Sequence, residues 1–161
     1  DPENTDIDWA TAVAQADRLR EVLEDGFDTV VGEKGVTLSG GQKQRVALAR
    51  TLLKAAPVLV LDDVTSAVDT GTEQAIFRGL ADFLYGKTTI LISHRITSLQ
   101  PAGRLLVLGD GRIVQDGSPE ALQRVPGYYR DIHLVQVDLE SEIIEETTSR
   151  GFQENHLYKA E

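Results

Sequence analysis

The chain has 161 residues, enough for one domain with its own core, and its hydrophobic (41%) and charged (26%) fractions are ordinary for a globular protein. Its net charge of −10 disfavours direct binding to a nucleic-acid backbone or to an anionic membrane surface. Cysteine is absent, which excludes disulfides and thiolate metal sites, and no apolar run approaches the roughly 20 residues of a membrane-spanning helix.

The first third of the chain is predicted to be helical. An amphipathic helix is expected over residues 8–24, where apolar side chains recur at helical spacing. A glycine-containing connector follows over residues 29–37. Ser39 is a favourable N-cap for a second helix that ends near Lys54. The buried side of this second helix is expected to comprise Val46, Leu48, Ala49, Leu52 and Leu53.

The middle of the chain has the pattern of two strands joined by a helix. Val58–Leu61 and Thr88–Ser93 are apolar enough to be strands buried on both faces, as in a parallel sheet. Between them, residues 72–85 are predicted to form a helix. A strand, a helix and a second strand predict a βαβ unit.

Towards the C-terminus a hairpin is predicted. Residues 104–108 and 112–115 flank Gly109-Asp110-Gly111, which is typical of a tight turn between antiparallel strands. Ser118 and Pro119 then favour the start of a short helix that ends near Val125.

The segment Leu38-Ser39-Gly40-Gly41-Gln42 is the first candidate site. A Ser-Gly-Gly turn that opens a helix points backbone N–H groups outward, as a phosphate site requires. Such a turn, taken alone, is usually only a helix start, so its context decides.

That context includes Asp62 and Asp63, which end the first predicted strand. Carboxylate oxygens are the ligands that Mg²⁺ prefers, although a strand-terminal aspartate also commonly caps the next turn.

Together with Ser66-Ala67-Val68-Asp69 and Ser93-His94-Arg95, these segments resemble the signature, Walker B, D-loop and switch-histidine motifs of an ATP-binding cassette (ABC) ATPase. The resemblance implies an α/β fold, with the parallel sheet of a P-loop NTPase and part of a helical subdomain. It predicts a helical, signature-bearing part over residues 1–55, the C-terminal part of the ATPase core over 56–134, and an acidic tail over 135–161.

The resemblance also implies roles for single residues. The signature and the D-loop contact ATP that is bound to an opposite cassette. The residues expected to make these contacts are Leu38, Ser39, Gly40, Gly41, Gln42, Ser66 and Asp69. Asp62 is expected to bind Mg²⁺ through water, and His94 to contact the γ-phosphate and the attacking water.

Asp63 departs from the family pattern, which has glutamate as the general base at this position. Aspartate is one methylene shorter, and a misplacement of about 1 Å can cost roughly 10²-fold in rate. We expect Asp63 to mark a degenerate, slowly hydrolysing catalytic site, paired with a different chain that carries the glutamate. The alternative is that aspartate serves as well as glutamate here.

A Walker A loop is missing from the sequence. Gly86-Lys87-Thr88 lacks the required earlier glycine, because position 81 is alanine, and it leads from a helix into a strand, the reverse of a P-loop. The chain alone is therefore expected not to hydrolyse ATP. Methionine is absent even at position 1, and we expect the missing motifs upstream in a longer protein.

Gly32-Glu33-Lys34-Gly35 resembles the X-loop of ABC exporters, which lies near their transmembrane domains, although a plain glycine-rich linker would look similar. It favours an exporter cassette on the cytoplasmic side of the cell membrane, paired with a second nucleotide-binding domain. One alternative is the C-terminal lobe of a chromosome-maintenance or DNA-repair ATPase, which the acidic charge disfavours. Another is a non-catalytic dimerisation module.

Overall fold

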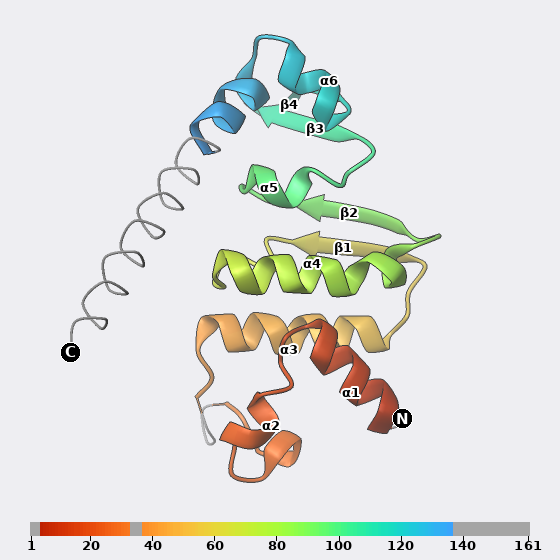
Figure 1. The fold of residues 1–161 in the computed structure, drawn as a ribbon, viewed down its shortest axis with the longest axis vertical. Coiled ribbons are helices and arrows are strands. Elements are labelled where there is room, and N and C mark those ends of the chain that lie inside the picture. Colours follow the sequence, from red (N-terminus) through yellow and green to blue (C-terminus); the bar gives the residue numbers. More distant parts are fainter. Residues whose placement is uncertain (1–3, 33–36, 137–161) are drawn as a thin grey trace, which may run out of the picture. The chain divides into compact units, whose positions relative to one another are not determined.

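The computed structural model describes residues 4–32 and 37–136 (Figure 1). The chain divides into two compact units, Asp1–Ser98 and Leu99–Glu161. This division falls at neither of the predicted domain limits, which stay predictions. Most of the predicted acidic tail, from residue 137 onward, lies outside the described residues.

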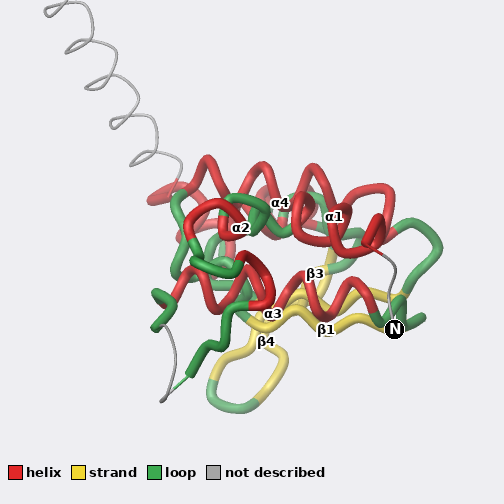
Figure 2. Tube along the Cα trace, turned by 90° about the horizontal axis from the view of Figure 1, so that it is seen from below, coloured by secondary structure: helices red, strands yellow, loops and turns green. Residues whose placement is uncertain are grey.

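The first unit combines helices with a small parallel sheet. Its elements, in chain order, are α1 (Asn4–Val13), α2 (Leu19–Val22), the 3₁₀ helix η1 (Gly26–Asp28), α3 (Gly40–Leu53), β1 (Val58–Asp62), α4 (Thr70–Leu84), β2 (Thr88–Ile92) and α5 (Ile96–Leu99). The last residue of α5 is counted with the second unit. Helix α1 packs against both α3 and α4 (Figure 2).

The predicted single helix over residues 8–24 is wrong, because the chain breaks after α1. Gln15 has a left-handed backbone (φ 54°), and the amide of Ala16 donates to the carbonyl oxygen of Thr11 at 2.7 Å, which closes the end of the helix. Arg45 Nη1 of α3 fixes this turn by donating to the Gln15 carbonyl oxygen at 2.6 Å. Because Arg45 is 30 residues away from Gln15, this contact cannot be inferred from the spacing of the apolar residues near Gln15.

The predicted second helix is confirmed as α3. Ser39 is its N-cap, and its last helical residue, Leu53, precedes the C-cap Lys54. Leu48, Ala49 and Leu52 are buried, so the apolar side of the helix faces the core as expected.

The predicted βαβ unit is confirmed, with β1 and β2 parallel and Val58 paired with Thr88. Burial of β1 on both faces is wrong. Leu59 and Leu61 join the core formed by α1, α3 and α4, whereas Val58 and Val60 are 54% and 56% exposed. Strand β2 also alternates between half-buried and exposed residues. In the described part of this unit the apolar core covers one face of the two strands only.

The second unit contains the predicted hairpin. Strands β3 (Leu105–Gly109) and β4 (Arg112–Gly117) are antiparallel. The turn residues Asp110 and Gly111 both have left-handed backbones (φ 49° and 72°), as a two-residue hairpin turn requires. The short helix is confirmed as α6 (Pro119–Arg124), with Ser118 as its N-cap.

Candidate functional site

The C-terminal ends of β1 and β2 bring together the two residues that were predicted to be catalytic. The amide of Asp63 donates to the Ile92 carbonyl oxygen at 2.9 Å, which extends the pairing of the strands by one residue. His94 Nδ1 lies 2.9 Å from Asp63 Oδ1. Asp63 has a left-handed backbone (φ 48°), which aspartate adopts more readily than most residues.

In this pair the Asp63 carboxylate is placed to orient the imidazole ring of His94. A carboxylate that accepts a hydrogen bond from Nδ1–H holds the ring in one direction and selects its tautomer. The side chains of His94 and Asp63 are 65% and 44% exposed, so both groups are accessible to a ligand.

Asp62, the predicted Mg²⁺ ligand, is exposed at the end of β1. Within residues 4–32 and 37–136, no group of three or more His, Cys, Asp or Glu side chains is placed to hold a metal ion. One carboxylate nevertheless fits Mg²⁺, which proteins commonly bind through one or two carboxylates together with substrate phosphates and water.

The predicted signature segment opens α3 with a reciprocal capping box. The Gln42 amide donates to Ser39 Oγ at 3.3 Å, and the Ser39 amide donates to Gln42 Oε1 at 2.8 Å. The amides of Gly40 and Gly41 begin the helix and so have no acceptor within it, which suits an anionic group. Leu38 is buried, so its side chain belongs to the core rather than to an exposed surface.

The start of α3 is docked on the predicted D-loop, Ser66–Asp69, by Gln44, which sequence reasoning missed. Gln44 Nε2 donates to Ser66 Oγ at 2.7 Å, and its Oε1 accepts from the Ala67 amide at 3.0 Å. Gly41 lies so close that a Cβ there would be 2.6 Å from the Ala67 carbonyl oxygen. The only sequence signal was a long polar residue two positions after the end of the signature segment.

Asp69 at the end of the D-loop caps α4. Its carboxylate accepts from the Thr72 amide at 2.9 Å and from the Thr72 hydroxyl at 2.6 Å. These hydrogen bonds, the hydroxyl first, lower the pKa of Asp69. A nucleotide contact by Asp69 would therefore compete with its role as a helix cap.

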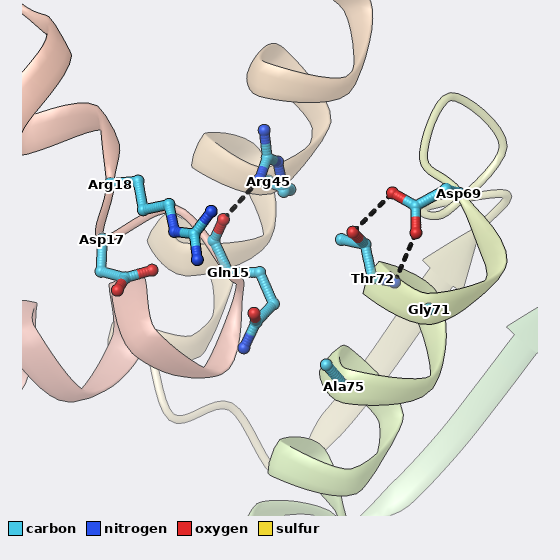
Figure 3. Close-up of a pocket in the computed structure, with 8 residues that line it drawn as sticks. All are labelled: Gln15, Asp17, Arg18, Arg45, Asp69, Gly71, Thr72 and Ala75. Atoms are coloured by element: carbon cyan, nitrogen blue, oxygen red, sulfur yellow. Dashed lines mark hydrogen bonds between the residues drawn. The ribbon is translucent and has the colours of Figure 1, made fainter. Parts of the chain in front are cut away.

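A polar pocket of about 340 Å³ lies beside Asp69 (Figure 3). It is bounded by the turn after α1, by α3 and by the start of α4. Its lining residues are Gln15, Asp17, Arg18, Arg45, Asp69, Gly71, Thr72 and Ala75. The two arginines and two aspartates balance one another, so the lining does not favour a ligand of one charge.

A second missed residue is Glu73, a buried carboxylate in the first turn of α4. It pairs with Arg95, the residue after His94, at 2.9 Å. Nothing in the sequence singles out Glu73, because a glutamate in a first helical turn is usually exposed and interacts favourably with the helix dipole.

Two further predictions concern glycine segments. Gly86-Lys87-Thr88 leads from α4 into β2, so it has the order of elements opposite to a P-loop. Of the predicted X-loop, Gly32 is described and has φ 132°, whereas residues 33–35 lie outside the described residues.

A helix that could span a lipid bilayer is not found in the part of the chain that the structure describes. The chain is similar to known membrane transporters. Residues 3–66 match the model of a family described as ABC transporter.

Among curated proteins, an ATP-dependent lipid A-core flippase from Alkalilimnicola ehrlichii is 44% identical over 135 residues, which cover 84% of this chain and 23% of that protein. A protein of the same name from Vibrio vulnificus is 46% identical over 131 residues, covering 81% of this chain and 22% of that protein. The chain thus spans about a quarter of the length of these relatives.

Among solved structures, a bacterial Atm1-family ABC exporter with ATP bound superposes with a TM-score of 0.75 at 40% identity. The match covers 83% of this chain and 23% of that one.

Proposed function

We propose that this chain, as part of an exporter nucleotide-binding domain of the ABC transporter family, couples ATP binding and hydrolysis in a cassette dimer to substrate export. The observation that carries the proposal is the pair Asp63–His94 at 2.9 Å, beside Asp62, at the carboxyl ends of two parallel strands. Ligands of open parallel sheets bind at this edge.

In this proposal the signature segment and the D-loop face the ATP of the opposite cassette. The unsatisfied amides of Gly40 and Gly41 and the dipole of the 14-residue α3 attract the γ-phosphate. The other contacts come from Leu38 through its main chain and from Ser39, Gln42, Ser66 and Asp69.

The residues at the strand ends act on the ATP bound to the same cassette. Asp62 would hold Mg²⁺, which neutralises the charge that develops on the transferred phosphate. Asp63 orients the attacking water and accepts its proton, while His94 holds the Asp63 carboxylate and contacts the γ-phosphate. The phosphate-cradling loop would come from a part of the protein outside these 161 residues.

Hydrolysis at this site is proposed to be slow. The Asp63 carboxylate is already engaged by His94, and it is one methylene shorter than the glutamate of the family. Such a site would work beside a second cassette, on a different chain, that supplies a glutamate.

The partners in this proposal are that second nucleotide-binding domain and transmembrane domains reached near Gly32–Gly35, on the cytoplasmic side of the membrane. The transported substrate would be bound by those domains. The relatives are named for lipid A-core, which makes an amphiphilic lipid the first class of substrate to test.

The test is ATP turnover of the complete transporter with Asp63→Glu, measured beside the wild type and beside Asp62→Asn as a metal-site control. A rise of about tenfold or more in Asp63→Glu would support a degenerate site. An unchanged rate would contradict it. The alternative is a purely non-catalytic dimerisation module. It predicts that ATP still drives dimerisation but that the Asp63→Glu variant hydrolyses no ATP.

A further inference from the structure

Glu73 lies in the first turn of α4, yet only 3% of the residue is exposed. Its Oε1 accepts hydrogen bonds from the hydroxyl groups of Thr65 at 2.5 Å and Ser98 at 2.7 Å. Its Oε2 accepts from Arg95 Nη1 at 2.9 Å. A buried carboxylate with three donors is held in one geometry, because losing a donor leaves charge unpaired in a dry environment.

Two of the three donors adjoin the segments that carry the proposed site. Thr65 directly precedes the D-loop, and Arg95 directly follows His94. Arg95 extends the connection, because its Nη2 donates to the Val68 carbonyl oxygen inside the D-loop at 3.1 Å. Glu73 therefore fixes the D-loop from both sides, once through Thr65 and once through Arg95.

We propose that Glu73 is a positioning residue that holds the D-loop and His94 in one mutual arrangement, so that both meet their nucleotides in register when the cassette dimer closes. This inference rests on the function proposed above. Glu73 touches no reacting atom in this proposal and acts through Arg95 and Thr65. Because Asp63 lies 2.9 Å from His94, its carboxylate is positioned by the same connection.

Stabilisation of the core alone does not explain why Glu73 is buried with a charged partner. Replacing a buried ion pair by apolar side chains of similar size is often neutral or stabilising. Here Glu73 accepts from the hydroxyl group of the loop residue Thr65, and Arg95 donates to the main-chain carbonyl oxygen of Val68. Neither Thr65 nor Val68 belongs to the hydrogen-bond ladder of β1 and β2. The network instead holds the D-loop and the segment around His94 in a fixed arrangement.

The expected effect of Glu73→Gln follows from this role. Glutamine keeps the size of the side chain but removes the charge that holds Arg95. Because a displacement of about 1 Å at the reacting groups costs up to roughly 10²-fold in rate, we expect kcat for ATP to fall about 10- to 100-fold. KM for ATP should change by less than about threefold, because positioning acts on the chemical step.

The experiment uses the complete protein that carries this chain. Glu73→Gln is compared with Glu21→Gln, which removes an exposed carboxylate on α2. Thr65→Val is a second variant that breaks one hydrogen bond with little change in shape. Steady-state turnover is measured together with backbone amide hydrogen exchange of residues 64–69 and 93–98 in the absence of nucleotide.

Faster exchange in both segments together, in Glu73→Gln and Thr65→Val but not in Glu21→Gln, is the expected result. Unchanged exchange, or loosening of one segment alone, would overturn the proposal, as would a raised KM with unchanged kcat. If Glu73→Gln fails to fold, Thr65→Val decides by the same readouts. A wild type that hydrolyses no ATP would refute the proposed function, while the exchange rates would still decide whether Glu73 couples the two segments.

Discussion

The arginine–carboxylate pair Arg95–Glu73 of the first unit and the pair Arg104–Asp116 of the second unit differ in their surroundings. Arg95 and Glu73 meet at 2.9 Å with side chains 27% and 4% exposed, whereas Arg104 and Asp116 meet at 2.7 Å with side chains 72% and 43% exposed. The first pair joins the first turn of α4 to Arg95, which lies beyond the hydrogen-bond ladder of β1 and β2. The second pair links residues at the same end of a hairpin whose strands are already paired. A buried charge pair can thus fix the position of a loop, whereas an exposed pair adds little to a hairpin whose strands already hold each other by main-chain hydrogen bonds.

The largest effect on stability is expected at Glu73. Glu73→Ala should lower the free energy of unfolding by about 3–5 kcal/mol, because it leaves Arg95 unpaired beside the core and removes the acceptor of two hydroxyl groups. Chemical denaturation measures this change. Glu21→Ala, at an exposed position, is the control and should change little. A cost below about 1 kcal/mol for Glu73→Ala would show that the buried pair is dispensable.

The pH dependence of stability is a second test of the buried pair. Burial raises the pKa of Glu73, but hydrogen bonds from Thr65, Ser98 and Arg95 outweigh it and hold the pKa below its ordinary value of 4.5. The unfolded chain then binds the proton more tightly, so this contribution is complete above that ordinary value and is lost as pH falls through the lowered pKa. Denaturation curves of Glu73→Gln should therefore show a shallower acid limb than those of the wild type. An identical acid limb would contradict this cause.

Gly41→Ala tests the contact between α3 and the D-loop. The new Cβ would lie 2.6 Å from the Ala67 carbonyl oxygen, so α3 or the D-loop must shift, at a cost of about 1–3 kcal/mol. Gly40→Ala is the matched control, since its nearest neighbour is the Ala67 Cβ at 3.8 Å, an ordinary contact. Thermal denaturation should separate the two variants, and equal melting temperatures would argue that the contact is loose.

Helix caps exist in both units and offer a smaller test. Ser39→Ala should cost about 1 kcal/mol, because it removes one half of a reciprocal capping box on α3. Ser118→Ala removes the cap of the six-residue α6, which makes no such box, and should cost less. Hydrogen exchange of the first turn of each helix measures both effects, and Ser→Thr at each position should restore the protection.

The smallest effect is expected at the exposed pair of the second unit. Arg104→Ala should leave the melting temperature nearly unchanged, and any difference should vanish in high salt, because water and ions screen an exposed pair. A loss of stability as large as that of Glu73→Ala would contradict the inference that the exposed pair contributes less than the buried pair.

The sequence predicted well those features that local chemistry decides. The cap at Ser39, the βαβ unit and the turn at Asp110–Gly111 all follow from residue types at fixed spacing, and the structure confirms them. Asp63 and His94 were singled out by their resemblance to family motifs, and their catalytic roles stay predictions. Their proximity follows from the confirmed strands, because each residue follows a strand and the ends of parallel strands meet at one edge.

What the sequence did not predict depends on contacts between distant residues. The break at Gln15 is stabilised by Arg45 of another helix, and the D-loop is held by Gln44 and Glu73. The exposure of Val58 and Val60 depends on which elements cover the sheet, and an apolar run alone cannot reveal that.

The left-handed backbone of Asp63 bears on which amino acids position 63 accepts. A φ of 48° is easiest for glycine, asparagine and aspartate and costs most for β-branched side chains. In a saturation library, Asn and Gly should therefore preserve the turn while removing the charge, whereas Val and Ile should be depleted for folding before any catalytic defect is selected. Asparagine is thus the substitution that separates the chemistry of this carboxylate from the shape of the main chain beneath it.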